Sequence, residues 1–424
     1  MRRCIPAAVT AAAFVLMCCT GCAAAEPPQG DSAPQESSAA EIPAFSLPDN
    51  ILGEPSDLVP AVTVDSYAVP ESAGMDFIRE LKLGWNLGNT FDASDVKSLT
   101  AEHEMEYESA WCGTVTTIEN IAAIKAAGFR TVRIPVSWHN HVDENDRISK
   151  AWMARVKEVA DWCMAMDLYV IINTHHDNAL EWYYPDEAHM ARSEQYLTAV
   201  WSQIAETFRD YDEHLILESL NEPRLVGTDY EWWFDPGSAK CQEAVGCINR
   251  LNQLFTDTVR ASGGNNAQRW LLCPGYAASV DGACDENFRV PEDPAGKVIV
   301  SVHAYTPYHF ALNKAGTKEW SLDSGSDTGE ILTMLDRLYG TFVQNGQPVL
   351  IGEFGALNKD NLEARTAFSA FYTKAARARG ISCLWWDNNA FTGSGENFGL
   401  LYRRSSTFSY PEIVQALLSG SETG

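Results

Sequence analysis

Short apolar runs alternate with longer amphipathic stretches along most of this chain, from about Met75 to Leu418. Apolar runs bounded by turn residues are typical of buried strands, and the stretches between them repeat apolar residues with the period of a helix. Eight strands that alternate with helices over about 340 residues predict one parallel (β/α)8 barrel, an α/β fold with a single domain. A doubly wound open sheet is the alternative fold at this point.

The expected elements can be placed along the sequence. The strands are residues 83–85, 131–134, 169–173, 215–218, 270–273, 298–302, 349–352 and 383–386. The helices between them include residues 117–127, 151–166, 193–211, 241–262, 332–343 and 362–379. Gly128 and Gly380 each follow one of these helices, where a glycine in the left-handed conformation commonly ends a helix.

The first 22 residues have the pattern of a targeting signal. Two arginines precede a short apolar run at residues 5–17, which is too short to span a bilayer as a mature helix. The run ends in Cys19-Thr20-Gly21-Cys22, which resembles the signal of bacterial lipoproteins. We expect a signal peptide at 1–22 and a lipid on Cys22, which would anchor the chain to the membrane at the cell surface; ordinary signal cleavage nearby is the alternative.

Residues 23–62 are rich in Ala, Pro, Ser and Glu and have little to bury, so we expect a disordered spacer followed by the barrel domain at 63–424. The formal net charge of the chain is −26, from 31 Lys and Arg against 57 Asp and Glu. So negative a surface repels phosphate backbones and excludes a nucleic acid as partner. We expect a monomer.

Seven cysteines follow the signal, so at least one thiol is unpaired unless a partner chain supplies a mate. They are Cys112, Cys163, Cys241, Cys247, Cys273, Cys284 and Cys383. Cys241 and Cys247 are close enough in sequence to pair. The spacing of the seven resembles no metal-binding set, and we expect no metal and no cofactor.

Two glutamates stand at the ends of expected strands. Glu222 follows the run 215–218 within Asn221-Glu222-Pro223, and Glu353 follows the run 349–352 within Gly352-Glu353-Phe354. Barrel enzymes place their chemistry at the C-terminal ends of strands, and a proline after Glu222 keeps that residue extended. A single glutamate at such a position is commonly a surface residue, but two glutamates at the ends of two strands predict a pair of catalytic carboxylates.

These motifs resemble those of the family 5 glycoside hydrolases, which are (β/α)8 barrels. Further stretches resemble subfamily 4 of that family: residues 84–89 (GWNLGN), 133–136 (RIPV), 173–176 (NTHH), 303–307 (HAYTP) and 385–388 (WWDN). The resemblance covers about Met75 to Leu418. It departs from the family at Ser109, where threonine is expected, and at Cys112, both in a loop expected near the glycone side.

The resemblance implies a retaining β-glycosidase, in which one carboxylate attacks the sugar and the other donates a proton to the leaving oxygen. Glu353 would be the nucleophile and Glu222 the acid/base. Arg133 and Tyr305 would hydrogen-bond Glu353, and His303 would be the partner of Glu222. Asn221 would bind the 2-hydroxyl of the sugar, Trp386 would form the floor beneath it, and neighbouring hydroxyls would be bound by Asn86, His175 and His176.

The implied substrate is a plant cell-wall β-glucan, and we expect an endo-β-1,4-glucanase, with a xyloglucan-specific enzyme as the alternative. Outer sugars could stack on tryptophan, and the candidates, each open against core packing, are Trp138, Trp182, Trp232 and Trp233. Two other classes of protein are alternatives to a glycosidase. In the first, a metal-dependent barrel hydrolase, the histidines of His139-Asn140-His141 and of His175-His176 could be metal ligands, although the first strand ends in Asn86 rather than in His-x-His. A non-catalytic solute-binding lipoprotein would share the signal, the acidity and the aromatic residues, but not the glutamate pair.

Overall fold

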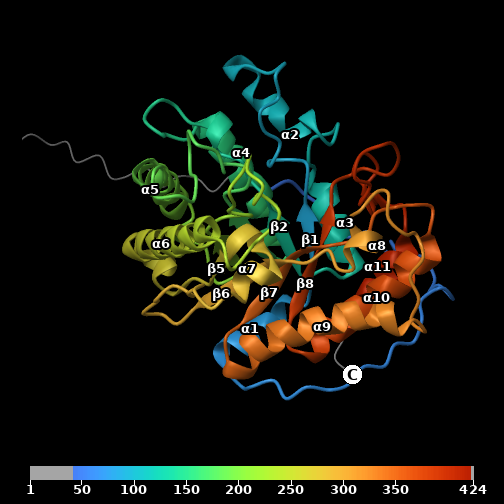
Figure 1. Cartoon of the computed structure of the whole chain (residues 1–424). Coiled ribbons are helices and arrows are strands. Elements are labelled where there is room, and N and C mark those ends of the chain that lie inside the picture. Colours follow the sequence, from blue (N-terminus) through green and yellow to red (C-terminus); the bar gives the residue numbers. More distant parts are fainter. Residues whose placement is uncertain (1–41, 422–424) are drawn as a thin grey trace, which may run out of the picture. The chain divides into compact units, whose positions relative to one another are not determined.

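The computed structural model describes residues 42–421 of the chain. Its centre is a closed barrel of eight parallel strands in the order β1-β2-β3-β4-β5-β6-β7-β8, surrounded by helices (Figure 1). The strands are β1 (Leu83–Leu87), β2 (Thr131–Ile134), β3 (Tyr169–Asn173), β4 (Leu215–Glu218), β5 (Leu271–Pro274), β6 (Val298–His303), β7 (Val349–Phe354) and β8 (Ser382–Asp387). The predicted (β/α)8 barrel is confirmed, and every expected strand is present within two residues of its predicted ends.

The barrel closes by the pairing of β1 with β8, in which Gly84 lies opposite Leu384 and Asn86 opposite Trp386. Side chains on a strand alternate between the two faces, so each strand sends every second side chain into the barrel. One end of the interior is apolar and includes Ile171, Ile216 and Leu350, which pack against α1 (Ala73–Leu81). Two residues further along β3 and β4 the same face carries Asn173 and Glu218, so a polar layer lies above the apolar one.

The helices of the outer layer pack on the barrel through one large apolar cluster. The longer ones are α3 (Ile118–Ala127), α4 (Lys150–Ala165), α5 (Met190–Thr207), α6 (Ala239–Ala261), α9 (Gly325–Thr341), α10 (Leu362–Ala378) and α11 (Pro411–Ser421). The short ones are α2 (Tyr107–Ala110), α7 (Val280–Ala283) and α8 (Tyr308–Ala311), and a two-stranded sheet is formed by β9 (Leu401–Tyr402) and β10 (Thr407–Phe408). The six expected helices are confirmed. Between β5 and β6 the helix position holds only the four residues of α7.

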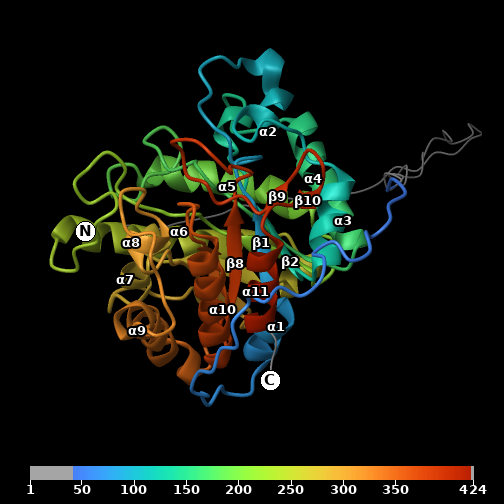
Figure 2. The same ribbon diagram turned by 90° about the vertical axis from the view of Figure 1, so that its right-hand side faces the viewer.

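The segment before α1 differs from the expectation. Ile51, Leu52 and Val62, which we expected in a spacer without core contacts, pack against the main apolar cluster. The Gln415 side chain in α11 donates to the carbonyl oxygens of Leu52 (3.0 Å) and Glu54 (2.9 Å). Figure 2 shows this segment, in blue, running along α10 and α11. The last part of the expected spacer therefore contacts the barrel domain, because its apolar residues pack against the main apolar cluster.

Two further expectations concern the described residues. All seven cysteines after the signal are unpaired, including Cys241 and Cys247, which both lie in α6. Within residues 42–421, none of the helices combines the length and the apolar character needed to cross a membrane. The expected signal and Cys22 lie outside the described residues.

Candidate active site

Arg133 lies at the centre of the polar layer, wholly buried at the inward-facing side of β2. Its Nε donates to Glu218 Oε2 (2.6 Å), and its Nη1 donates to Glu353 Oε1 (2.7 Å). Its Nη2 donates to Asn221 Oδ1 (2.8 Å). The guanidinium thus holds three strand-end residues in fixed relation, as its planar fork of donors allows.

Glu353 lies on β7 where the pairing with β6 shifts register, so that it comes opposite His303. Tyr305 Oη donates to Glu353 Oε2 (3.0 Å), while Arg133 occupies the other oxygen. The contacts expected of Arg133 and Tyr305 are therefore present. Two donors on separate oxygens orient the carboxylate and favour its charged form.

Glu222 follows β4 and projects toward His303 at the end of β6. His303 Nδ1 lies 2.8 Å from Glu222 Oε1 and 3.6 Å from Glu353 Oε1. One ligand atom from each of these three residues lies within 4.8 Å of the others. The expected partnership of His303 and Glu222 is present, and the imidazole lies between the two carboxylates.

The three groups shift one another's proton affinity. Burial acts to raise the pKa of Glu222, but the hydrogen bond from His303 and the charges of His303 and Arg224 lower that pKa to about 2. Burial raises the pKa of Glu353, against the opposing effects of His303 and Arg133. Burial acts to lower the pKa of His303, yet the charges of Glu353 and Glu222 raise it above its ordinary value. In the free cleft these shifts favour a proton on His303 over one on Glu222.

Asn86 does not lie where a substrate could reach it. It is fully buried, and its Nδ2 donates to the carbonyl oxygens of Gly352 (2.9 Å) and Trp385 (3.2 Å). Its Oδ1 accepts from Arg133 Nη1 (3.0 Å). Both ends of the Asn86 amide are therefore bonded to groups of β2, β7 and β8, which counts against the expectation that Asn86 binds a sugar hydroxyl. Arg133 likewise contacts residues of the protein and is closed to a sugar.

The remaining predicted sugar ligands gather on one side of the carboxylates. The His175 ring lies parallel to Trp386, with ring centres 5.8 Å apart, and His176 packs edge-on against His175 at 4.4 Å. Asn173 Nδ2 lies 3.1 Å from His175 Nδ1 and donates to it, which leaves the Nε2–H of His175 as a donor for a ligand. Burial lowers the pKa of His176 to about 4, so both rings are neutral at pH 7.

The four candidate tryptophans fall into two groups. Trp138 is fully buried and donates from Nε1 to the carbonyl oxygen of Asn173 (2.8 Å), and Trp182 packs against the core beneath Arg192. Trp138 therefore belongs to the packing of the fold, and Trp182 is half-buried against it. Trp232 and Trp233 are 64% and 73% exposed in the loop after β4. Trp111, near Cys112, adds a further exposed ring 5.7 Å from His176.

Three residues of the site were missing from the predicted set. Glu218 and Ser301 lie in the barrel interior, where Ser301 Oγ donates to Glu218 Oε1 (2.6 Å). Their positions follow from strand alternation, since they are two residues beyond Ile216 and Ile299, which face inward. Arg224 lies 3.7 Å from Glu222 Oε2, and only the path of the loop after β4 reveals this contact.

The histidines considered as metal ligands have other partners. His139 Nδ1 lies 2.9 Å from Asp177 Oδ1, and the His141 ring stacks on Trp152 at 3.7 Å. Asp92, His175 and His176 also come together within 4.8 Å. However, the oxygens of Asp92 accept from the backbone amides of Asn89 and Thr90, and His175 Nδ1 accepts from Asn173. Within this group the acceptor nitrogen of His175 and one acceptor position on each Asp92 oxygen are thus engaged within the fold.

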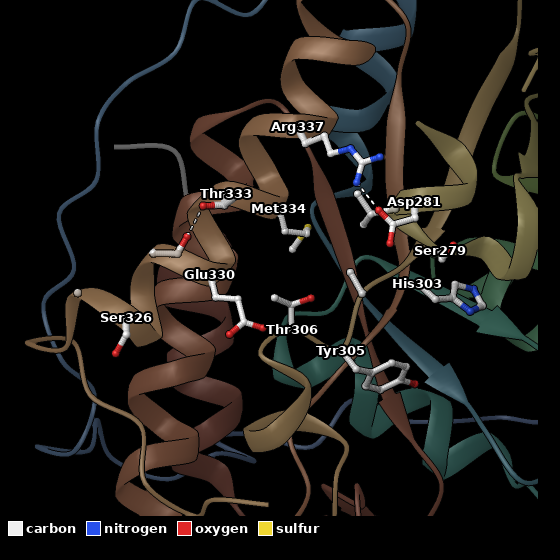
Figure 3. Close-up of a pocket in the computed structure, with 14 residues that line it drawn as sticks. Ser279, Asp281, His303, Tyr305, Thr306, Ser326, Glu330, Thr333, Met334 and Arg337 are labelled. Atoms are coloured by element: carbon white, nitrogen blue, oxygen red, sulfur yellow. Dashed lines mark hydrogen bonds and ion pairs between the residues drawn. The ribbon is translucent and has the colours of Figure 1, made fainter. Parts of the chain in front are cut away.

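A cavity of about 660 Å³ lies beside β6, in the space left by the short α7. It is lined by Thr306, by Glu330 and Thr333 of α9, and by the ion pair of Arg337 with Asp281. Figure 3 shows the rings of His303 and Tyr305 pointing away from Glu330 and Thr333. The cavity therefore lies behind the segment whose rings reach the two carboxylates.

A parallel eight-stranded barrel that presents two adjacent carboxylates at the ends of β4 and β7 defines a glycoside hydrolase of the barrel type. Residues 92–392 match the cellulase family, glycosyl hydrolase family 5. The chain belongs to glycosyl hydrolase family 5.

Several relatives resemble most of the chain. Endoglucanase A of Clostridium longisporum is 42% identical over 358 residues, which cover 84% of this chain and 68% of that protein. The solved structure of a family 5 lichenase from Caldicellulosiruptor sp. F32 is 48% identical, with a TM-score of 0.84, and covers 86% of this chain and 99% of that one. A GH5-4 broad specificity endoglucanase from Ruminococcus champanellensis is 43% identical, with a TM-score of 0.77, and covers 83% of this chain and 100% of that one.

Proposed function

We propose that this glycoside hydrolase is a retaining endo-β-1,4-glucanase, with Glu353 as nucleophile and Glu222 as acid/base. The observation that carries the mechanism is the approach of the two carboxylates: one oxygen of Glu222 lies within 4.8 Å of one oxygen of Glu353. Retaining enzymes hold their carboxyl groups about 5–5.5 Å apart, whereas inverting enzymes leave about 6.5–9.5 Å for a water molecule. The narrow gap favours direct attack by one carboxylate.

In the first step Glu353 attacks the anomeric carbon while the leaving oxygen takes a proton from Glu222. Arg133 and Tyr305 hold Glu353 from both of its oxygens and leave its remaining lone pairs to point into the cleft. A bound sugar covers what is left of the exposed Glu222 side chain, which is 17% accessible in the free cleft. Burial favours the neutral carboxyl, so sugar binding moves the proton from His303 to Glu222, 2.8 Å away.

In the second step a water molecule replaces the leaving group. The ester formed by Glu353 carries no charge, so the repulsion that this carboxylate exerted on Glu222 is gone and Glu222 ionises readily. Glu222 then takes a proton from the water as it attacks the anomeric carbon, and Glu353 departs as a carboxylate. The proton that Glu222 takes from the water then returns to His303 Nδ1 across the same 2.8 Å contact, which restores the free cleft.

The sugar before the cleaved bond would lie over Trp386, between Asn221 and the two histidines of β3. Asn221 Oδ1 is occupied by Arg133, so its Nδ2 is the group available to the 2-hydroxyl. His175 would donate from Nε2 to a neighbouring hydroxyl. These contacts are neutral donors, which suit an uncharged polysaccharide in a strongly acidic protein.

The relatives support a β-glucan as the substrate, since their names include endoglucanase, lichenase and broad specificity endoglucanase. No specific observation favours a xyloglucan-specific enzyme. The test is a comparison of kcat/KM on carboxymethyl cellulose, mixed-linkage β-glucan, xyloglucan and xylan, with and without EDTA. The proposal expects metal-independent release of internal fragments from the first two polymers, and it is overturned if only xylan is cleaved or if EDTA abolishes the activity.

We further propose that the protein is exported, acts as a monomer, and is tethered by a lipid on Cys22 through a spacer of about 30 residues. The basis is the signal-like sequence that ends in Cys19-Thr20-Gly21-Cys22. Cys22→Ser should move the protein from the membrane fraction into the medium with its specific activity unchanged. Retention of this variant in the membrane fraction would contradict the anchor.

A further inference from the structure

A tyrosine in the outer layer of helices is bonded to the strand end that carries two residues of the site. Tyr372 lies in α10, and its side chain is fully buried. Its Oη donates to the carbonyl oxygen of Ala304 (2.7 Å), the residue directly after β6. Ala304 stands between His303, which contacts Glu222, and Tyr305. The hydroxyl of Tyr372 therefore holds the chain one residue away from each of these two rings.

Two hydrogen bonds hold the backbone on either side of Ala304. Its amide nitrogen donates to the carbonyl oxygen of Glu353 (2.9 Å), which fixes the peptide that leads back to His303. Its carbonyl oxygen accepts from Tyr372, which fixes the peptide that leads on to Tyr305. The backbone of His303 is thus held by the neighbouring strand β7, whereas that of Tyr305 is held by a side chain of α10.

Tyr372 is itself held in place by aromatic packing. Its ring stacks on Phe354, the residue after Glu353, with ring centres 4.6 Å apart and planes at 16°. Phe368, one turn earlier in α10, packs on the same ring with centres 5.4 Å apart. Burial raises the pKa of Tyr372 well above its ordinary value, so the hydroxyl stays protonated and remains a donor. The side chain thus joins β7, through packing, to the end of β6, through a hydrogen bond.

We propose that Tyr372 is a positioning residue for the reaction, which acts through Tyr305 on the proposed nucleophile Glu353. The inference rests on the proposed function, since a donor to Glu353 affects the rate only if Glu353 attacks the sugar. Tyr305 Oη donates to Glu353 Oε2 (3.0 Å), and Arg133 holds the other oxygen. A hydrogen bond depends on direction as well as distance, so it orients the carboxylate only while Tyr305 is fixed.

Removal of a single hydroxyl group tests this dependence. In Tyr372→Phe the carbonyl oxygen of Ala304 stays buried but loses its donor. An unpaired buried carbonyl is costly, so the peptide should turn toward another donor and displace the Tyr305 ring. The phenyl ring at position 372 keeps the packing on Phe354, so the substitution removes the bond and preserves the core.

The first measurement is kcat/KM on a nitrophenyl β-cellobioside, whose cleavage needs attack by Glu353 but little protonation of the leaving group. Tyr372→Phe should lower this value by about fivefold or more, because misplacement of a reacting group is costly, while Tm falls by only a few degrees. Tyr339→Phe is the matched control, since Tyr339 in α9 also donates to a backbone carbonyl oxygen, that of Ala68 (2.8 Å). The control should change kcat/KM by less than about twofold.

A double-mutant cycle shows whether Tyr372 acts through Tyr305. Tyr305→Phe removes the donor to Glu353, and in that background Tyr372→Phe should lower kcat/KM by less than about twofold further. If the two substitutions instead cause independent losses that multiply, the hydroxyl of Tyr372 affects activity by another route, and the link through Tyr305 is overturned.

The pH profile of kcat/KM is a second readout, which a general loss of stability would not move. The bond from Tyr305 favours the charged form of Glu353, so its weakening raises the pKa of that carboxyl. Tyr372→Phe should therefore move the acid limb of the profile upward by about half a pH unit. The other charged groups that face Glu353 are not substituted: Arg133, His303 and Glu222. An acid limb that stays in place would contradict the link.

The outcomes separate this inference from the proposed function. If Glu353→Ala keeps full activity, Glu353 is not the nucleophile, and the proposed function and the link are both refuted. If Glu353→Ala is inactive but Tyr372→Phe matches the wild type in kcat/KM and in its acid limb, the link is wrong and the proposed function stands.

Discussion

Arg133 Nε donates to Glu218 Oε2 over 2.6 Å inside the barrel, and both side chains are fully buried. Glu218 thereby fixes the guanidinium whose other end holds Glu353 at 2.7 Å. Arg133 carries one positive charge between two carboxylates, and the charges of Glu218 and Glu353 keep its pKa above the ordinary value despite its burial. The position of the proposed nucleophile therefore depends on a glutamate that touches no substrate.

This relationship predicts the effect of Glu218→Gln. The amide removes one of the two charges that offset the buried guanidinium, so the free energy of unfolding should fall by about 3 kcal/mol. Arg133 should also lose its fixed orientation, and kcat should fall by about tenfold or more with KM changed less. Ser301→Ala is the control, because it removes only the neutral donor to the other oxygen of Glu218 and should cost about 1 kcal/mol. Equal stability of Glu218→Gln and the wild type would contradict the account.

Asn221→Asp tests the amide beside the nucleophile. Because Arg133 occupies Asn221 Oδ1, the Nδ2 group is left to donate to the 2-hydroxyl, and an aspartate cannot donate there. We expect kcat/KM to fall by about 100-fold while Tm changes little. A substrate that lacks the 2-hydroxyl should lose a similar factor with the wild type and no further factor with Asn221→Asp. Independent, additive losses would show that the two groups do not meet.

Asp92 should make stability depend on pH. Burial raises the pKa of Asp92 from 3.8 to about 7, although the amides of Thr90 and Asn89 act to lower it. Its contribution is fully present below pH 3.8 and is lost as the pH rises to about 7, because the unfolded chain releases this proton first. In Asp92→Asn the loss is absent, so the variant should gain about 4 kcal/mol relative to the wild type between pH 4 and pH 7.5. Parallel curves of Tm against pH for the two proteins would contradict the shift.

Two truncations test where the folded domain begins, and we propose a start near residue 50. A chain that starts at residue 50 keeps Ile51, Leu52 and the bonds to Gln415, and should match the full-length Tm. A chain that starts at residue 63 loses these contacts, and its free energy of unfolding should fall by about 3 kcal/mol. Gln415→Ala should destabilise the first chain and leave the second unchanged. Equal Tm values for both chains would show that residues 50–62 do not stabilise the domain, and would support the predicted spacer that ends at residue 62.

Much of this fold could be predicted because each strand is a short apolar run with clear limits. The run at residues 131–134 and β2 are identical, and so are residues 215–218 and β4. The helix α1 was not predicted, since its nine residues join β1 through Lys82 alone and merge with the following apolar run. The packing of Ile51 and Leu52 depends on a surface formed by α11, far along the chain, which no local pattern describes.

The residues of the site likewise include some that the sequence predicted and some that it did not. Glu222 and Glu353 could be found because strand ends in a barrel converge on one face. Whether Asn86 faces a sugar or the protein depends on the register of β1 against β8, and that register cannot be predicted from the local sequence pattern. The contact of Arg224 with Glu222 depends on how a loop of several residues turns back, which side-chain patterns do not determine.

The central claim is that Glu353 attacks the sugar and Glu222 transfers the proton, and the configuration of an azide product tests it most directly. Glu222→Ala should still be glycosylated by a nitrophenyl β-cellobioside, whose leaving group needs little protonation, and should then wait for a base. Added azide should restore turnover and give the β-cellobiosyl azide, because azide enters from the face that Glu222 serves. In Glu353→Ala azide can only replace the nucleophile and should give the α-azide. An α-azide from Glu222→Ala together with a β-azide from Glu353→Ala would reverse the two roles, and full activity of either variant on cellulose would contradict the mechanism.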